Sequence, residues 1–230
     1  MLGEWTCQRP DGRTSKELLL EIAGSDSAEN SKLLILPALF DEANKLRRQT
    51  VLIMRSLAEL GIGSALPDLP GMNESLAPLD EQSLTQWRKD AAQVAEHLGA
   101  THVLAIRGGA LIAPDTLPCW QYAPTGGARL LRNMLRARVL ASKEAGRAET
   151  TSELGELGVK QGLELAGWRF GPALFSELQS AEPAENSQQT TIAQSDIGGA
   201  ALWLRAEADE NAAQAQKLAS IIADAMAGVS

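Results

Sequence analysis

Histidine and cysteine are both scarce in this chain of 230 residues, which has only two of each. Any mechanism that needs an imidazole must therefore use His97 or His102. The cysteines, Cys7 and Cys119, form no CxxC pair and no cluster with a histidine. That spacing excludes a structural zinc site, so we expect no metal and no cofactor. The sequence leaves open the possibility of a single disulfide between the two cysteines.

Basic residues and long apolar runs are also few. Twenty-one Lys and Arg stand against 29 Asp and Glu, a net charge of -8, which argues against binding nucleic acid or an anionic membrane through the overall field. The longest apolar run, residues 33–40, is far shorter than the roughly 20 residues of a membrane span. The first residues, MLGEWTCQRPDG, do not resemble a signal peptide. We expect a cytoplasmic protein without membrane insertion; homodimer formation is left open.

Short apolar runs alternate with amphipathic stretches that end at glycine, a pattern typical of right-handed βαβ units. The expected strands are 17–23, 33–36, 62–67, 101–106, 117–122, 190–194 and 200–205. The expected helices are 46–60, 81–98, 126–145 and 212–227. The pattern predicts one α/β domain over 1–230 with a mainly parallel sheet. Residues 146–167, polar and weakly periodic, are expected to form a cap or excursion outside it.

Ligand sites in such sheets lie beyond the carboxyl ends of the strands. One turn there, DLPGMNES at residues 68–75, resembles the Asp-x-x-Gly-x-Gly-x-Ser turn of α/β-hydrolases, with Asn73 at the second glycine. Asn tolerates the left-handed conformation well after Gly. The alternative is a generic tight turn. In both interpretations this segment has a structural role and not a catalytic one.

The connection after residues 101–106 carries the sequence Arg107-Gly108-Gly109. A sharp nucleophile turn needs small residues two positions before and after its centre, and Ala105 and Gly109 meet that need. The central residue is Arg107, whose guanidinium stays protonated and cannot attack a carbonyl. A helix starting at Gly108 would add backbone amides for an anion. A glycine-rich connection without a catalytic role is the alternative.

The loop over residues 37–48 follows the strand whose exit usually supplies an oxyanion-hole amide. Its polar residues Glu42, Asn44 and Arg48 could point into the site. The alternative is a capped helix start at Asp41 or Asn44 with solvated arginines.

The motifs together resemble the α/β-hydrolase-like proteins called exosortase A system-associated hydrolase 2. The matching segments, in the right order, are LPALFDEANKLRR (36–48), DLPG (68–71), WRKD (87–90), IRGGA (106–110), WQYAP (120–124) and LR (135–136). Ala38 and Asp41 depart from the family's Pro and Glu. The resemblance implies a three-layer α/β-hydrolase-like fold with a reduced cap, in a bacterial hydrolase linked to exopolysaccharide and exosortase loci.

The usual triad cannot be assembled in its usual order, which is nucleophile, acid and then histidine. Both histidines precede Arg107, and none follows residue 102. Ser75 and Cys119 are nearby nucleophiles without a base. The late carboxylates have no histidine to orient: Asp196, Glu207 and Asp209. We therefore expect a degenerate catalytic site.

Binding of a small anionic or glycan-related molecule is the function we expect first. Arg129, Arg132 and Arg136 form a positive strip at helical spacing, for which a solvated face is the alternative. The expected ligand-binding residues are Phe40, Glu42, Asn44, Arg48, Arg107 and Gly108. Two alternatives stay open: an atypical esterase or thioesterase acting on an acyl ester, and a non-enzymatic interaction protein of the export machinery.

Overall fold

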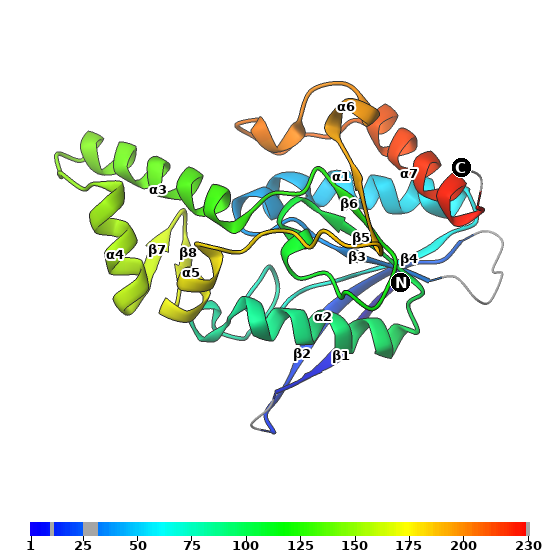
Figure 1. Cartoon of the computed structure of the whole chain (residues 1–230), viewed down its shortest axis with the longest axis horizontal. Coiled ribbons are helices and arrows are strands. Elements are labelled where there is room, and N and C mark those ends of the chain that lie inside the picture. Colours follow the sequence, from blue (N-terminus) through cyan, green and yellow to red (C-terminus); the bar gives the residue numbers. More distant parts are fainter. Residues whose placement is uncertain (10–11, 25–31, 229–230) are drawn as a thin grey trace.

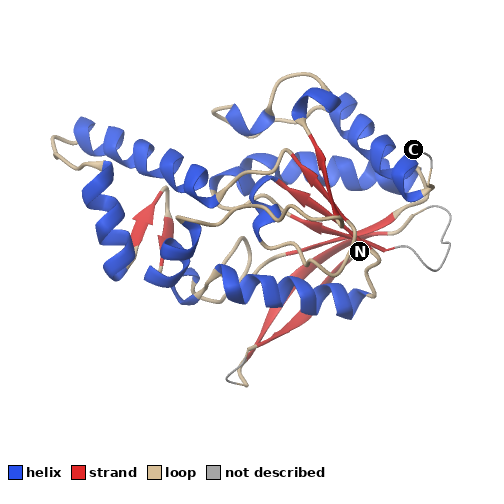
Figure 2. Ribbon diagram, in the orientation of Figure 1, coloured by secondary structure: helices blue, strands red, loops and turns tan. Residues whose placement is uncertain are grey.

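A seven-stranded sheet forms the centre of the computed structural model, which describes residues 1–9, 12–24 and 32–228 (Figure 2). Its strands, in spatial order, are β1 (Leu2–Gln8), β2 (Thr14–Ile22), β4 (Gly63–Pro67), β3 (Lys32–Leu36), β5 (His102–Ile106), β6 (Cys119–Tyr122) and β9 (Gln189–Ile192). The strands β4, β3, β5, β6 and β9 pair in parallel with one another, whereas β1 and β2 form an antiparallel hairpin at one edge and β2 pairs antiparallel with β4. The predicted, mainly parallel sheet is confirmed.

Helices cover both faces of the sheet and make three layers (Figure 1). α1 (Asp41–Glu59) and α7 (Ala212–Met226) pack together on one face, and α2 (Leu84–Leu98) lies on the other. Strand β3 shows why: Leu34 and Leu36 join the core on the α2 side, while Leu33 and Ile35 join the core on the α1 side. An apolar run buried on both faces is typical of an inner parallel strand.

Several element boundaries differ from the sequence-based expectation. α1 begins at Asp41, five residues before the expected start, because Glu42 and Ala43 are already buried. α2 begins at Leu84 after the N-cap Ser83, whose side chain accepts a hydrogen bond from the Gln86 amide. A short 3-10 helix, η1 (Leu79–Glu81), precedes that cap.

The strand expected at 200–205 is wrong. That segment forms a 3-10 helix, η3 (Leu202–Leu204), preceded by the short helix α6 (Gln194–Ile197). Only Leu202 of the three is buried, since Trp203 and Leu204 face the region beyond the carboxyl ends of the strands. The sheet therefore ends at β9 in the part of the chain that the structure describes.

Residues 146–167 form regular structure beside the far end of α3 (Gly127–Glu144), away from the main sheet (Figure 1). α4 (Thr151–Gln161) begins at a capping box between Thr150 and Glu153. β7 (Leu163–Leu165) then pairs with β8 (Trp168–Phe170) in a small hairpin, and α5 (Pro172–Leu178) follows.

Neither a membrane span nor a disulfide is found in the described ranges. None of the helices there combines the length and apolar composition that crossing a bilayer requires. Cys7 and Cys119 are both buried and free, so the disulfide left open by the sequence does not form.

Candidate functional site

The chain turns sharply where β5 ends. Arg107, the next residue, has a φ of 55°, a left-handed conformation that is uncommon outside glycine. Two residues later, a Cβ on Gly109 would lie 2.5 Å from the Leu36 carbonyl oxygen and 2.6 Å from that of Pro37. Only glycine fits so close to the end of β3. The sharp turn predicted after residue 106 is thus present.

The α-helix expected to begin at Gly108, directly after this turn, is not present. Arg107–Leu111 forms a 3-10 helix of five residues, η2, too short to offer the anion-binding N-terminus expected at Gly108. Gly108 itself is buried, and a Cβ on it would lie 2.9 Å from Cδ1 of Leu130 in α3. Gly108 therefore allows close packing of η2 against α3.

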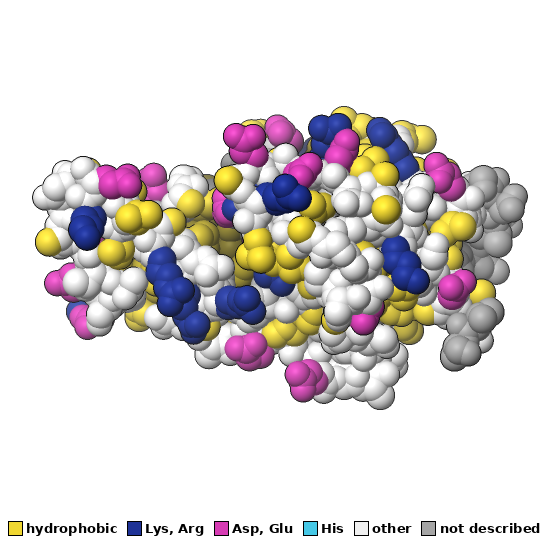
Figure 3. All heavy atoms as spheres, turned by 90° about the horizontal axis from the view of Figure 1, so that it is seen from above, with side chains coloured by type: hydrophobic (Ala, Val, Ile, Leu, Met, Phe, Trp, Pro, Cys, Tyr) yellow, Lys and Arg dark blue, Asp and Glu magenta, His cyan; other side chains and the backbone are white. Residues whose placement is uncertain are grey.

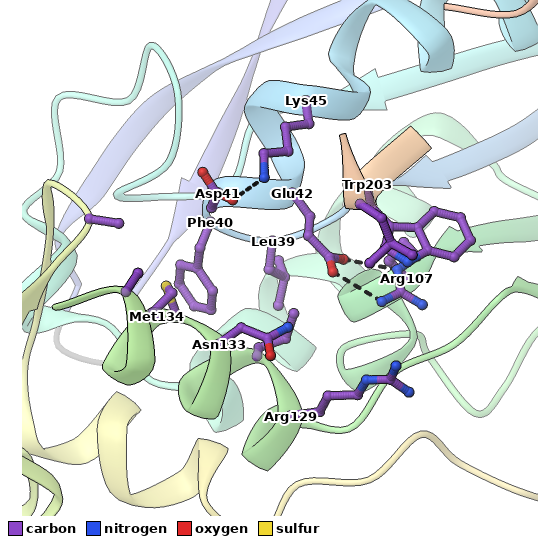
Figure 4. Close-up of a pocket in the computed structure, with 14 residues that line it drawn as sticks. Leu39, Phe40, Asp41, Glu42, Lys45, Arg107, Arg129, Asn133, Met134 and Trp203 are labelled. Carbon is purple, nitrogen blue, oxygen red and sulfur yellow. Dashed lines mark hydrogen bonds and ion pairs between the residues drawn. The ribbon is translucent and has the colours of Figure 1, made fainter. Parts of the chain in front are cut away.

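The side chain of Arg107 is held from three directions (Figure 4). Its Nε and Nη2 donate to the two carboxylate oxygens of Glu42, at 2.9 and 3.0 Å, and Nη1 donates to the Ala123 carbonyl at 2.6 Å. The guanidinium carbon lies 4.1 Å from the ring centroid of Trp203, a cation–π contact. The two charged side chains are only 6% and 10% exposed. Glu42 therefore neutralises the charge of Arg107 inside the protein.

Sheet topology explains why Arg107 and Glu42 meet. β3 and β5 are parallel neighbours with Leu36 opposite Ala105, so their carboxyl ends lie side by side. Glu42 follows β3 in the first turn of α1, and Arg107 follows β5 directly. A carboxylate is also favoured in the first turn of a helix, because it faces the free backbone amides.

A cavity of about 420 Å³, here called the elbow cavity, opens beside this pair (Figure 4). Its volume lies in the range of small-molecule sites, roughly 300–1,000 Å³. It is formed by the start of α1, by η2, by α3, by the β7–β8 turn and by η3. Its lining residues are Leu39, Phe40, Asp41, Glu42, Lys45, Arg107, Arg129, Leu130, Asn133, Met134, Ala137, Ala166, Trp203 and Leu204.

One positive charge in the elbow cavity is left without a partner. Both carboxylates are paired: Asp41 with Lys45 at 2.8 Å, and Glu42 with Arg107. Arg129 is exposed, and its guanidinium has no hydrogen-bond or ion-pair partner among the described residues. The unbalanced charge of the cavity therefore lies on α3.

The predicted ligand-binding residues separate into two groups. Phe40, Glu42 and Arg107 line the elbow cavity, although most of the Phe40 ring is buried in an aromatic cluster with Trp87, Trp168 and Phe170. Asn44 and Arg48 are exposed and do not line it. The Arg48 guanidinium instead pairs with Glu210.

Sequence reasoning missed Asp41, Lys45, Asn133 and Trp203 as lining residues. Asn133 had a usable signal, since it lies one helical turn after Arg129. Trp203 had no such signal, because the apolar run around it predicts a strand.

The turn at residues 68–75 is a tight structural turn, as predicted. Asn73 has a φ of 49°, and its side chain donates to Oδ1 of the buried Asp68 at 2.9 Å. Ser75 Oγ accepts hydrogen bonds from the backbone amides of Gly71 and Ala77. Ser75 therefore stabilises the turn.

Neither histidine lies at the elbow cavity. His102 begins β5, five residues or about 16 Å of strand from Arg107. It stacks on Trp120 with centroids 5.3 Å apart, and burial lowers its pKa. His97 is exposed in the last turn of α2.

The other candidate nucleophile and two of the late carboxylates have structural surroundings that do not favour catalysis. Burial raises the pKa of the Cys119 thiol to about 12. Asp196 accepts the Ala193 amide at the start of α6, and Asp209 pairs with Arg205. Among the described residues, those that line the elbow cavity include no serine, threonine, cysteine or histidine.

Comparison with solved structures shows the fold. Est1E from Butyrivibrio proteoclasticus, solved with ferulic acid, is 12% identical with a TM-score of 0.58, and the match covers 97% of this chain and 98% of that one. Mouse alpha/beta hydrolase domain-containing protein 10 is 12% identical with a TM-score of 0.55, covering 99% and 100%. No family model and no curated protein sequence matches the chain. The chain has a three-layer α/β-hydrolase fold.

Proposed function

We propose that the elbow cavity binds a small anionic or glycan-related ligand, and that the chain does not act through a Ser–His–Asp triad. The observation that carries this proposal is Arg107 at the centre of the turn, neutralised by Glu42. In the usual α/β-hydrolase site this position exposes a nucleophile. Here a guanidinium occupies it and cannot attack a carbonyl.

Arg129 is the residue proposed to recognise the anion. Lys45 and Arg107 are each paired with a carboxylate, whereas the Arg129 guanidinium keeps its donors free among the described residues. Asn133 lies one turn further along the same side of α3 and can add an amide hydrogen bond. A single unpaired cation beside an amide suits one carboxylate.

The apolar wall is proposed to hold the body of the ligand. Trp203, Leu130 and Met134 present a ring and aliphatic surface next to Arg129. An indole ring stacks on flat or weakly polar surfaces, such as an aromatic ring or the C–H face of a sugar. The resemblance to exosortase A system-associated hydrolase 2 favours the glycan-related class, because it would associate the chain with exopolysaccharide loci.

Two carboxylate probes test the proposal and separate the ligand classes. Ferulate is an aromatic acid, and D-glucuronate is a sugar acid. We expect titration calorimetry to detect binding of at least one of them. Arg129→Gln should weaken that binding about tenfold or more, since it removes charge-assisted hydrogen bonds. Arg55→Gln is the matched control, because it makes the same change in charge at an exposed position of α1 that lines neither the elbow cavity nor any cavity on α3.

Equal affinity of the parent and the Arg129→Gln variant would contradict the proposed role of Arg129. Binding of neither probe by the parent would contradict the ligand class. Hydrolysis of p-nitrophenyl acetate that survives purification, and that one substitution in the elbow cavity abolishes, would overturn the non-catalytic assignment.

A further inference from the structure

A second cavity, of about 410 Å³, lies on the opposite flank of α3, where this helix meets the start of α4 and α5. α3 contributes positions 128, 131, 132, 135 and 136 to it, whereas positions 129, 130, 133, 134 and 137 line the elbow cavity. At 100° per residue the average directions of the two sets are nearly opposite, and Arg129 and Arg136, seven residues apart, lie along the border between them. We call this second space the α3–α5 cavity.

The α3–α5 cavity carries only positive charge. Its lining residues are Ala128, Leu131, Arg132, Leu135, Arg136, Thr151, Phe175 and Gln179. None is acidic, although the chain has 29 Asp and Glu. In the described ranges neither the guanidinium of Arg132 nor that of Arg136 has a hydrogen-bond or ion-pair partner. Figure 3 shows Lys and Arg side chains gathered along the surface over α3.

The two guanidinium groups are one helical turn apart, where like charges repel. An anion placed between them would replace this repulsion with two charge-assisted interactions. The Thr151 hydroxyl at the start of α4 and the Gln179 amide after α5 add polar groups from two other elements. Together these groups offer more donors, and more positive charge, than one carboxylate would use.

Below the arginines the cavity has an apolar floor of Leu131 and Phe175, both buried. Gly158 of α4 lies against the Phe175 ring so closely that a Cβ would come within 2.5 Å of Cζ. Only glycine at position 158 leaves room for the Phe175 ring, and the α4 backbone there packs directly against the ring. Above this closed floor, Leu135 is only half-buried and offers accessible apolar surface next to the charged rim.

We propose that the α3–α5 cavity binds a phosphomonoester, with the phosphoryl group between Arg132 and Arg136 and its organic part on the half-buried Leu135. A phosphoryl group carries nearly two negative charges at neutral pH and has three acceptor oxygens. It therefore matches the two arginines and the polar groups of Thr151 and Gln179. This site shares no residue with the elbow cavity, so the proposal made for it can be tested independently of the function proposed for the elbow cavity.

Titration of the full chain with phenyl phosphate and with inorganic phosphate tests this site. We expect phenyl phosphate to bind and to shift the backbone amide resonances of Thr151 and Gln179 in NMR spectra, but not that of Trp203 in the elbow cavity. The double variant Arg132→Gln/Arg136→Gln should weaken binding at least about tenfold, because it removes both charge-assisted contacts. All four positions used here, including those of the control, are exposed, so the variants should fold.

The matched control is Arg55→Gln/Lys217→Gln, which removes two positive charges, both without a partner among the described residues, from α1 and α7 on the other face of the sheet. Its affinity for phenyl phosphate should equal that of the parent. Tighter binding of phenyl phosphate than of inorganic phosphate would identify a phosphorylated organic molecule as the ligand, whereas equal binding would identify free phosphate. Unchanged binding by the Arg132/Arg136 double variant, or no shift at Thr151 and Gln179, would overturn the proposal.

Discussion

Arg107 and Glu42 form a two-point ion pair across 65 residues of sequence, with both carboxylate oxygens bonded to the same guanidinium. The pair connects the end of β5 to the first turn of α1. Through the Ala123 carbonyl and the Trp203 ring, the same guanidinium also holds the segment after β6 and the 3-10 helix η3. One side chain thus joins four segments at the wall of the elbow cavity.

Breaking this pair from one side should destabilise the protein strongly. Arg107→Met leaves the Glu42 carboxylate buried without its partner, and the expected loss in free energy of unfolding is about 3–5 kcal/mol. Arg107→Met/Glu42→Leu removes both charges, so it should be more stable than the Arg107→Met variant. Urea unfolding measures both quantities. Arg48→Met is the control: it breaks an exposed pair with Glu210 and should change stability by less than about 1 kcal/mol.

Replacing Gly109 or Gly155 by alanine should change the stability of the protein in opposite directions. Gly109→Ala would push a Cβ into the backbone at Leu36 and Pro37, and we expect a loss of about 1–3 kcal/mol or more. Gly155 lies inside α4, and a Cβ added to it would have no atom within 4 Å, so Gly155→Ala should raise stability by about 0.5–1 kcal/mol. Thermal unfolding of the two variants tests the pair. A stable Gly109→Ala protein would mean that the turn can move away from β3.

The inner strands of the sheet could be predicted from sequence because they are short apolar runs bounded by turns, whereas the edge strand β1 is not among the expected strands. Leu33 to Leu36 contribute alternately to both cores, and the sequence indicated that burial. The turn at Arg107 could also be predicted, since its small flanking residues are local. Local rules suffice wherever a residue's neighbours in space are also its neighbours in sequence.

The functional contacts could not be predicted because they join distant segments. Glu42 and Arg107 were both candidates, but nothing in the sequence indicates that each one neutralises the other. Trp203 faces a partner 96 positions earlier, and the short apolar run around it reads equally well as a strand. In α4, Gly158 is required by the Phe175 ring, and together with Gly155 it weakens the helical pattern.

Both cysteines should be almost inert in the folded protein. Burial raises the pKa of Cys7 and of Cys119 from 9.0 to about 12. Three pKa units reduce the thiolate fraction about 1,000-fold, and the thiolate is the reactive form. We expect no reaction with a disulfide reagent such as dithionitrobenzoate on the timescale of minutes, and reaction of two thiols in urea. Rapid labelling of either cysteine in the native state would contradict the buried placement.

Stability should fall on mild acidification because of His102. Burial lowers its pKa below the ordinary value of 6.5, so the unfolded chain binds the proton more tightly than the folded one. The contribution of His102 is complete above pH 6.5 and is lost as the pH falls through the lowered pKa. Urea unfolding between about pH 7.5 and pH 5 should show this loss in the parent. His102→Gln should reduce the slope, and His97→Gln, at an exposed position, should retain it. An unchanged slope in the His102→Gln variant would assign the pH dependence to other groups.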